Sequence, residues 1–295
     1  EEILGDRISD GQINAKKGDS IRLKRIPVTL AGHPIPDEDS VAGARRIVAL
    51  ERQAGPHDIV FLCHSGGATA LTALPAPGIS LADLQTVYRL LYFECGAAMP
   101  VANAVRNQLV VLHSRHPRYF GQATAIQLET SETPLGLRVH AYEAPNCGDG
   151  GYRAAIEVLH AYRLWERVPE SVRRFLLAAD RRYGHLQPEE LAGKAYYSFR
   201  TMGPETMLAA ARRRAEELGV RPVILASSLN DVEARAIGEA LGYMATEIAV
   251  LGQPFAPPCL LILGGELVVA VGDATGCGGR NQEFVLAAAG RIAGY

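Results

Sequence analysis

The sequence has few of the features that mark specialised classes of protein. Its 295 residues include only five cysteines, which are widely spaced and form no C-x-x-C pair. This usage argues against a disulfide framework or a structural zinc site, and it is typical of a reducing compartment, here expected to be the cytoplasm. The eight histidines show no H-x-x-x-H or H-E-x-x-H spacing, so the sequence assigns no metal ligands.

An excess of charge and a long apolar run are also missing. The chain has 30 Lys and Arg against 32 Asp and Glu, which gives a net charge of −2. No global field therefore favours nucleic acid or an anionic membrane. No apolar run is long enough to span a bilayer, and the start EEILGDRISD does not read as a signal peptide. We therefore expect small-molecule partners, neither nucleic acid nor membrane, and leave a homo-oligomer open.

What the sequence does contain is an alternation of short apolar runs with longer amphipathic ones. DIVFLC (58–63) precedes LADLQTVYRLLYFECGA (81–97), and RPVILAS (221–227) precedes DVEARAIGEALGYMATEIA (231–249). This alternation predicts βα units with strands buried on both faces, and hence an α/β fold. A weak change in composition within HLQPEELAGKAYYS (185–198) predicts a boundary between domains at 1–192 and 193–295.

Local signals place several helix starts and one turn. Ser80 with Asp83 resembles a capping box, and Pro169 and Pro204 each precede a glutamate at a helix start. The acidic residues 37–39 precede another helix, where compensation of the helix dipole is favoured over a metal site. CLLILGGELVVAVGD (259–273) reads as two strands joined by a tight turn at its glycine pair.

Two segments of the first half are candidates for binding an anion. Ser65, Gly66 and Gly67 follow the strand DIVFLC, where a glycine-rich turn exposes backbone N–H groups to a phosphate. A simple turn is the alternative. Asn103 and Arg106 lie three residues apart, so on a helix they share a face that could grip a carboxylate or phosphate. A solvated helix face is the alternative there.

The third candidate is GDATGCGGRNQEFVLAAAG (272–290), in which Arg280 stands where a helix begins. A helix N-terminus carries partial positive charge and disfavours a cation. Either Arg280 is exposed and partly compensated by Glu283 one turn on, or the glycines, the free N–H groups and the guanidinium converge on one bound anion.

Taken together, these segments resemble the glycerate 2-kinase family, whose members often carry a hydroxypyruvate reductase label and end in a MOFRL domain. AGHPIPDE (31–38), SGG (65–67) before ALTALPAPGISLADLQ, NAVR (103–106), GGE (264–266) and GRNQE (279–283) occur in the family's order. The resemblance implies two α/β domains with an active-site cleft between them, the first with a mainly parallel Rossmann-like sheet. Residues 1–192 would be the glycerate kinase-like domain without its start, and 193–295 the MOFRL-like domain without its end.

The resemblance also implies a reaction, ATP-dependent phosphorylation of the 2-hydroxyl of D-glycerate with Mg²⁺. Arg280 would then stabilise charge on the transferring phosphoryl group, bordered by Glu266, Gly279 and Asn281. Ser65, Gly66 and Gly67 would cradle a phosphate or the substrate, and Asn103 and Arg106 would hold the glycerate carboxylate.

The sequence also departs from the family pattern. The family's catalytic lysine lies upstream of residue 1, and its C-terminal Gly/Asp-rich motif is expected after residue 295. Ala68 and Thr69 replace Gly-Ser, Asn107 replaces a lysine, and Leu267 replaces a threonine. LHSRHPRYFG (112–121), SETPLG (131–136) and EAPNCG (143–148) replace family motifs as well. Two alternatives therefore stay open: a diverged relative that binds a nucleotide or acid without catalysis, and a hydroxypyruvate reductase, which the absence of a G-x-G-x-x-G fingerprint disfavours.

Overall fold

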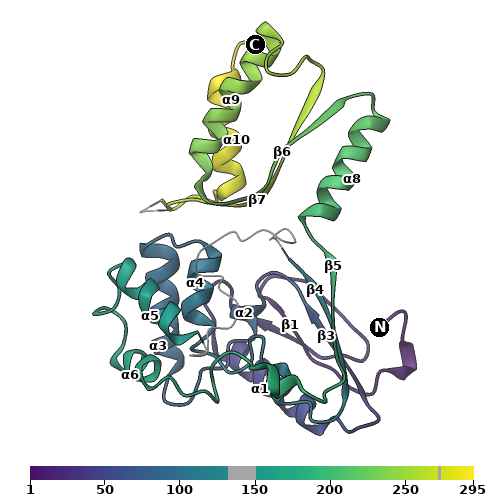
Figure 1. Ribbon diagram of the computed structural model, residues 1–295, viewed down its shortest axis with the longest axis vertical. Coiled ribbons are helices and arrows are strands. Elements are labelled where there is room, and N and C mark those ends of the chain that lie inside the picture. The colour runs from purple at the N-terminus through teal and green to yellow at the C-terminus, as the bar shows by residue number, and fades with distance from the viewer. Residues whose placement is uncertain (132–150, 272–273) are drawn as a thin grey trace. The chain divides into compact units, whose positions relative to one another are not determined.

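The computed structural model describes residues 1–131, 151–271 and 274–295 (Figure 1). These residues form two compact units. The first unit contains residues 1–95, 99–129 and 151–200, and the second contains residues 201–271 and 274–295 together with residues 96–98 and 130–131. Each unit combines helices with parallel strands, which confirms the predicted α/β class. The domain boundary at 192–193 stays a prediction.

The strands of the first unit form two small sheets. β1 (Ile13–Lys16) pairs in parallel with β2 (Val28–Ala31), and β3 (Ile59–His64) pairs in parallel with β4 (Thr124–Thr130). β5 (Tyr196–Met202) follows β4 in the second of these sheets. The parallel pairs agree with the expected sheet of the first domain, although in the described residues it is divided in two. The segment LRVHAYEA (137–144), which is strand-like in its residue pattern, lies outside the described residues.

Two helices of the first unit begin where Ser80 and Pro169 predict them. Ser80 caps α3 (Leu81–Arg89) in a capping box with Asp83, and Pro169 precedes α6 (Glu170–Ala178). A π-helical turn (Leu90–Glu94) continues α3, and short 3-10 turns occupy Gly5–Arg7 and His116–Arg118. The remaining helices are α1 (Glu38–Gln53), α2 (Ala68–Leu71), α4 (Met99–Arg106), α5 (Tyr152–Ala161) and α7 (Pro188–Leu191).

The core of the first unit lies among its helices and on one side of β3. Leu84, Tyr88 and Leu91 are fully buried, and Leu81, at helical spacing from them, is partly buried. Leu62 of β3 packs against Phe120. The prediction that strands are buried on both faces is wrong for β3, because Ile59 and Phe61 are 59% and 45% exposed. Successive strand residues point to opposite faces, and only the Leu62 side of β3 is covered in the described chain.

The second unit is built around one pair of parallel strands. β6 (Arg221–Glu233) pairs with β7 (Cys259–Val268), and α8 (Pro204–Glu217) contacts both strands. α9 (Ala234–Leu251) and α10 (Arg280–Ile292) lie side by side (Figure 1). A Cβ on Gly242 would lie 2.6 Å from the Cβ of Arg291, so this glycine allows the two helices to approach closely. No described helix in either unit is long and apolar enough to cross a membrane.

The predicted turn at Gly264 and Gly265 is wrong, because β7 runs through both glycines as one strand. Gly265 has a φ of 132°, and a Cβ there would overlap the backbone of Leu229 on β6. The register between the strands shifts on both sides of this pair. The glycines therefore permit a bulge and a close strand approach, which a sequence cannot distinguish from a reversal.

The acidic segment before α1 is a helix cap, as the sequence analysis favours. The Asp37 side chain accepts a hydrogen bond from the backbone N–H of Ser40 at 3.0 Å and pairs with Lys17 at 2.7 Å. Partial burial alone would raise the pKa of Asp37. Hydrogen bonds from Lys17 and from the backbone of Ser40 outweigh burial and lower this pKa to about 2.

Asp37→Ala is expected to lower the free energy of unfolding at pH 7 by about 1 kcal/mol, because it removes the cap. The folded-state pKa is below the ordinary 3.8, so the carboxylate stabilises the fold above that pH and loses its effect as the pH falls towards about 2. Denaturant unfolding of both proteins between pH 7 and pH 2.5 measures the difference. Asp39→Ala, which also removes a Lys17 partner but no cap, is the matched control; equal losses in the two variants would contradict the capping role.

Candidate functional site

The loop between β3 and α2 is the first candidate site. Ser65 and Gly66 are exposed. Gly67 is the N-cap of α2 with a φ of 86°, and its carbonyl accepts hydrogen bonds from the N–H groups of Ala70 and Leu71. A Cβ on Gly67 would lie 3.1 Å from the ring of His33. The glycine therefore serves both a left-handed backbone and a close approach by His33.

Gly67→Ala tests whether this turn matters for the chemistry. The substitution places a Cβ at a positive φ and against the His33 ring, so we expect a loss of about 1–3 kcal/mol in stability. If the loop binds a phosphate, as the resemblance implies, the affinity for a nucleotide falls as well. Differential scanning calorimetry and nucleotide titration measure the two effects. Gly78→Ala, at a φ of 85° with nothing within 4 Å of its Cβ, is the matched control. Equal nucleotide affinity in the two variants would contradict a phosphate-binding role for the loop.

Asn103 and Arg106 come together on one face of α4, as their spacing predicts. The Nε of Arg106 donates to the Oδ1 of Asn103 at 2.5 Å, and the Nδ2 of Asn103 donates to the Sδ of Met99 at 2.8 Å. The guanidinium carbon of Arg106 lies 5.5 Å and 5.3 Å from the ring centroids of Tyr88 and Tyr92. Arg106 is thus buried and fixed in orientation. Because the Asn103 oxygen accepts from Arg106, Asn103 orients the guanidinium.

Arg106 also changes the electrostatics of its surroundings. Burial lowers the pKa of His113 well below its usual 6.5, and the positive charges of Arg106 and Arg115 lower it further. His113 Nδ1 lies 3.1 Å from the hydroxyl of Thr69 on α2. Burial raises the pKa of Tyr88 above its ordinary range. The region around Arg106 is therefore positively charged, with a neutral imidazole and a neutral phenol beside it.

Two more histidines, His64 and His116, act electrostatically on His113 and extend this polar cluster. Burial lowers the pKa of His64 to about 4, helped by the neighbouring His116, whose ring centroid lies 4.9 Å away. His116 Nδ1 is 2.5 Å from Glu51 Oε1, and both side chains are buried. The sequence analysis does not predict this group of histidines, because they lie at irregular spacings along the chain. The H-x-x-H pair at 113 and 116 is the one local pattern that points to it.

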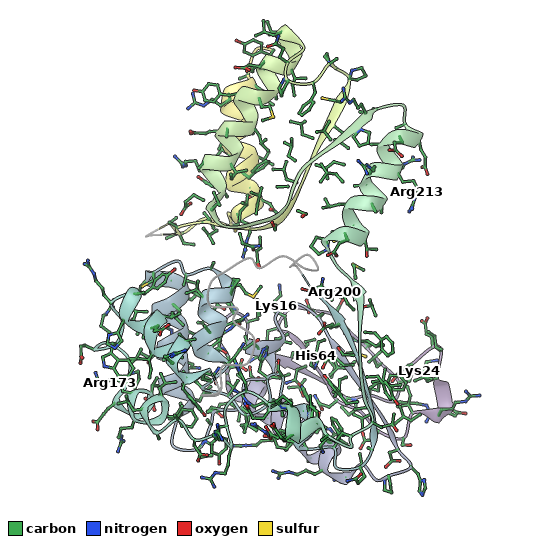
Figure 2. All side chains as sticks on the ribbon, in the orientation of Figure 1. Lys16, Lys24, His64, Arg173, Arg200 and Arg213 are labelled. Carbon is green, nitrogen blue, oxygen red and sulfur yellow. The ribbon has the colours of Figure 1, made fainter. Side chains whose placement is uncertain are left out.

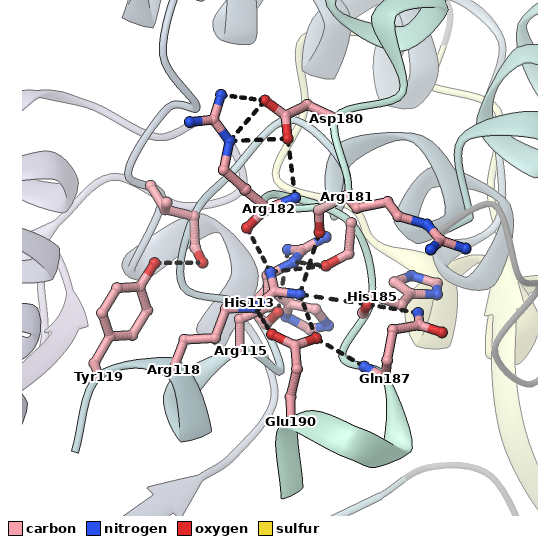
Figure 3. Close-up of polar contacts among 12 residues, drawn as sticks. His113, Arg115, Arg118, Tyr119, Asp180, Arg181, Arg182, His185, Gln187 and Glu190 are labelled. Carbon is pink, nitrogen blue, oxygen red and sulfur yellow. Dashed lines mark hydrogen bonds and ion pairs between the residues drawn. The ribbon is translucent and has the colours of Figure 1, made fainter. Parts of the chain in front are cut away.

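A network around the buried Arg115 and the partly buried Arg118 holds the segment after Arg106 in place (Figure 3). Arg115 is fully buried and donates to the carbonyls of Gly184 at 2.8 Å and Asn107 at 2.7 Å. Arg118 binds the carboxylate of Glu190 with two contacts of 2.6 and 2.9 Å. Burial lowers the pKa of Arg115 to about 10, which leaves it charged at neutral pH. These arginines are structural, and they fix the replaced family segment 112–121 against residues 184–190.

The second candidate site lies at the start of α10 in the second unit. Gly279 is the N-cap with a φ of 134°, and Arg280 is the first residue of the helix. Nη1 of Arg280 donates to Glu266 Oε1 at 2.6 Å and to the carbonyl of Leu267 at 2.9 Å. The alternative in which Glu283 compensates Arg280 is wrong, because Glu283 pairs with Arg235 at 2.8 Å and β7 supplies the acceptors for Arg280.

The glycines before α10 leave room beside Arg280. A Cβ on Gly276, Gly278 or Gly279 would meet nothing within 4 Å, and Asn281 is exposed in the first turn of the helix. This start of a 13-residue helix has room for an anion, and an anion site there stays a prediction. The structure gathers Glu266, Gly279, Arg280 and Asn281 in the second unit and Ser65, Gly66, Gly67, Asn103 and Arg106 in the first. Their action on one substrate stays a prediction.

No group of three or more His, Cys, Asp or Glu side chains within residues 1–131, 151–271 and 274–295 could hold a metal ion. The described residues therefore do not assign ligands to Mg²⁺. A polyphosphate can itself supply oxygen ligands to Mg²⁺. The Ser65–Gly67 loop and the start of α10 are therefore candidate sites for phosphates, not for the metal.

The chain is similar to known proteins over almost its whole length. A domain of unknown function (DUF4147) matches residues 1–177. The chain is 35% identical to a glycerate 2-kinase of Pyrococcus horikoshii over 99% of this chain and 66% of that protein, and 32% identical to a protein of Agrobacterium vitis named as a hydroxypyruvate reductase, over 97% and 73%. The crystal structure of a glycerate kinase from Thermotoga maritima superposes with a TM-score of 0.71 at 30% identity, over 100% of this chain and 68% of that one.

The chain spans about two thirds of the length of the glycerate 2-kinase relatives that it matches. The domain match covers more than half of its residues, and the identity to these relatives exceeds 30%. The chain therefore belongs to the DUF4147 family, together with proteins named glycerate 2-kinase and hydroxypyruvate reductase.

Proposed function

We propose that the protein transfers the terminal phosphoryl group of ATP to the 2-hydroxyl of D-glycerate. The observation that carries this proposal is Arg280, held by Glu266 and Leu267 at a glycine-rich helix start, in a chain that is 35% identical to a glycerate 2-kinase. A fixed guanidinium beside free backbone N–H groups is suited to an anion whose charge changes during the reaction. Mg²⁺ would enter bound to the phosphates of ATP.

The mechanism consists mainly of positioning and neutralisation of charge, as in other phosphoryl transfers. Arg106 holds the carboxylate of glycerate, with its guanidinium oriented by Asn103 and by the rings of Tyr88 and Tyr92. The N–H groups of the Ser65–Gly67 loop bind a phosphate. Arg280 stabilises the negative charge that the transferring group spreads over its oxygens. Under this proposal Arg106 serves the acceptor acid and Arg280 serves the transferring phosphoryl group.

A diverged relative that binds without catalysis is the second candidate, and one contact favours it. Thr69 stands where the family usually has a serine, and its hydroxyl is buried and engaged with His113 rather than free for a ligand. A hydroxypyruvate reductase is the third candidate; it requires a nicotinamide cofactor, and no Gly-x-Gly-x-x-Gly fingerprint follows any described strand.

Turnover by the natural protein distinguishes the three candidates. ADP release is measured with Mg-ATP and a panel of hydroxy acids that includes D-glycerate, and oxidation of NADH and NADPH is measured with hydroxypyruvate. The proposal predicts ADP release that depends on D-glycerate. Nucleotide binding by calorimetry without turnover would instead establish the binding relative, and hydroxypyruvate-dependent NADH oxidation would establish the reductase.

A further inference from the structure

His33 is exposed, lies against the proposed phosphate-binding loop, feels the charge of Arg106 and has no role in the function proposed so far. It stands in the loop between β2 and α1, and its ring packs on Gly67 of the phosphate-binding loop, 3.1 Å from the position of a Cβ there. We propose that His33 is the base that accepts the proton of the acceptor hydroxyl. This inference rests on the proposed function and names the residue that completes its chemistry.

The covalent structure of the acceptor indicates where its hydroxyl would lie relative to His33. In a 2-hydroxy acid the carbon that carries the hydroxyl is bonded directly to the carboxylate carbon. With the carboxylate on Arg106 and a phosphate on the Gly67 loop, the hydroxyl must lie between them. The His33 ring lies against Gly67, and the charge of Arg106 acts on it. A base at this point can therefore reach the 2-hydroxyl of a substrate as small as glycerate.

The protonation state of His33 suits this role. Burial by the surrounding loops lowers the pKa of His33 below 6.5, and the positive charges of Arg106 from α4 and Lys16 from β1 lower it further. Lys16 ends β1 in the first unit (Figure 2). The ring is therefore neutral at pH 7 and able to take a proton.

The other histidines of the cluster are less suited to the same task. His113 is engaged by the Thr69 hydroxyl, and His116 is bound to Glu51 in the interior. His64 faces His116 and is largely enclosed, which lowers its pKa to about 4 and makes it a weak base. His33 alone among these four is exposed, so a substrate can reach its ring.

The step balances without a further reactant. The 2-hydroxyl oxygen of D-glycerate forms a bond to the γ-phosphorus of ATP as its proton passes to a ring nitrogen of His33. The bond from that phosphorus to the bridging oxygen breaks, and its electron pair leaves with ADP. His33 then returns the proton to solvent, which its exposure allows.

The test compares His33→Gln with His57→Gln, an exposed histidine outside the cluster. We expect His33→Gln to lower kcat for D-glycerate about 100-fold, with little change in KM. In the unsubstituted protein kcat is expected to fall as the pH drops through the pKa of His33, which lies below 6.5. This acid limb is expected to vanish in His33→Gln but to persist in His57→Gln. Imidazole added to His33→Ala is expected to restore part of the rate, which no purely structural role of the ring explains.

Failure of this inference is distinct from failure of the proposed function. Glycerate-dependent turnover in His33→Gln at the unsubstituted rate, with the acid limb retained, would overturn the role of His33 and leave the kinase proposal standing. Absence of glycerate-dependent turnover in the unsubstituted protein would overturn both. A higher KM with an unchanged kcat would make His33 a binding residue and would contradict its role as the base.

Discussion

Arg280→Ala is expected to lower kcat for D-glycerate phosphorylation by about 10³-fold, because an arginine that stabilises the transferring phosphoryl group contributes an effect of this size. The side chain is partly exposed and paired with Glu266. An ion pair of this kind contributes about 0–1 kcal/mol to stability. The fold should therefore survive, and steady-state kinetics beside a thermal melt separates the two effects.

Arg213→Ala is the matched control for this prediction. Arg213 is exposed on α8, in the same unit as Arg280 (Figure 2). It should leave kcat and KM unchanged. If Arg280→Ala retained kcat within a factor of about three of Arg213→Ala, roughly 0.7 kcal/mol, Arg280 would have no place in the transition state.

Arg106→Gln is expected to raise the KM for D-glycerate about 100-fold. Two charge-assisted hydrogen bonds to the carboxylate contribute about 3 kcal/mol, and each 1.4 kcal/mol corresponds to about a tenfold change in affinity. Arg106→Lys retains the charge but not the planar fork, so its KM should lie between those of the glutamine variant and the unsubstituted protein. Initial rates over a range of D-glycerate concentrations measure the effect.

The buried position of Arg106 requires a check on folding. Its guanidinium lies over Tyr88 and Tyr92, so part of the effect of Arg106→Gln falls on stability. The KM for ATP is therefore measured in the same variants, because a general loss of structure would raise both constants. Arg174→Gln, an exposed arginine on α6, is the control. Unchanged KM for D-glycerate in both Arg106 variants would remove Arg106 from the acid site.

The features that the sequence analysis predicts correctly depend on nearby residues. The Ser80 capping box, the helix start at Pro204 and the place of Arg280 at the first position of α10 all follow from backbone chemistry within one turn of helix. The Asn103–Arg106 contact likewise follows from a spacing of three residues on a helix. Interactions of this range can be predicted from a sequence, because the local backbone conformation decides which nearby groups come together.

The features that it misses depend on chain segments far apart in sequence. His33 meets Gly67 through the packing of two loops, and Arg115 meets Gly184 across 69 residues. The glycine pair in β7 reads as a turn because its reason, the backbone of Leu229, lies on another strand. The exposure of Phe61 likewise depends on which elements cover β3. Such contacts are set by tertiary packing, which overrides the local pattern.

Phosphorus NMR of the reaction mixture shows directly whether the phosphoryl group reaches the 2-hydroxyl of D-glycerate. The natural protein is incubated with Mg-ATP and D-glycerate, and the products are compared with authentic 2-phosphoglycerate and 3-phosphoglycerate. The proposed function predicts a phosphomonoester on the 2-hydroxyl, formed in the same amount as ADP. ADP formed with inorganic phosphate alone, a phosphate on the 3-hydroxyl, or unchanged ATP would contradict it.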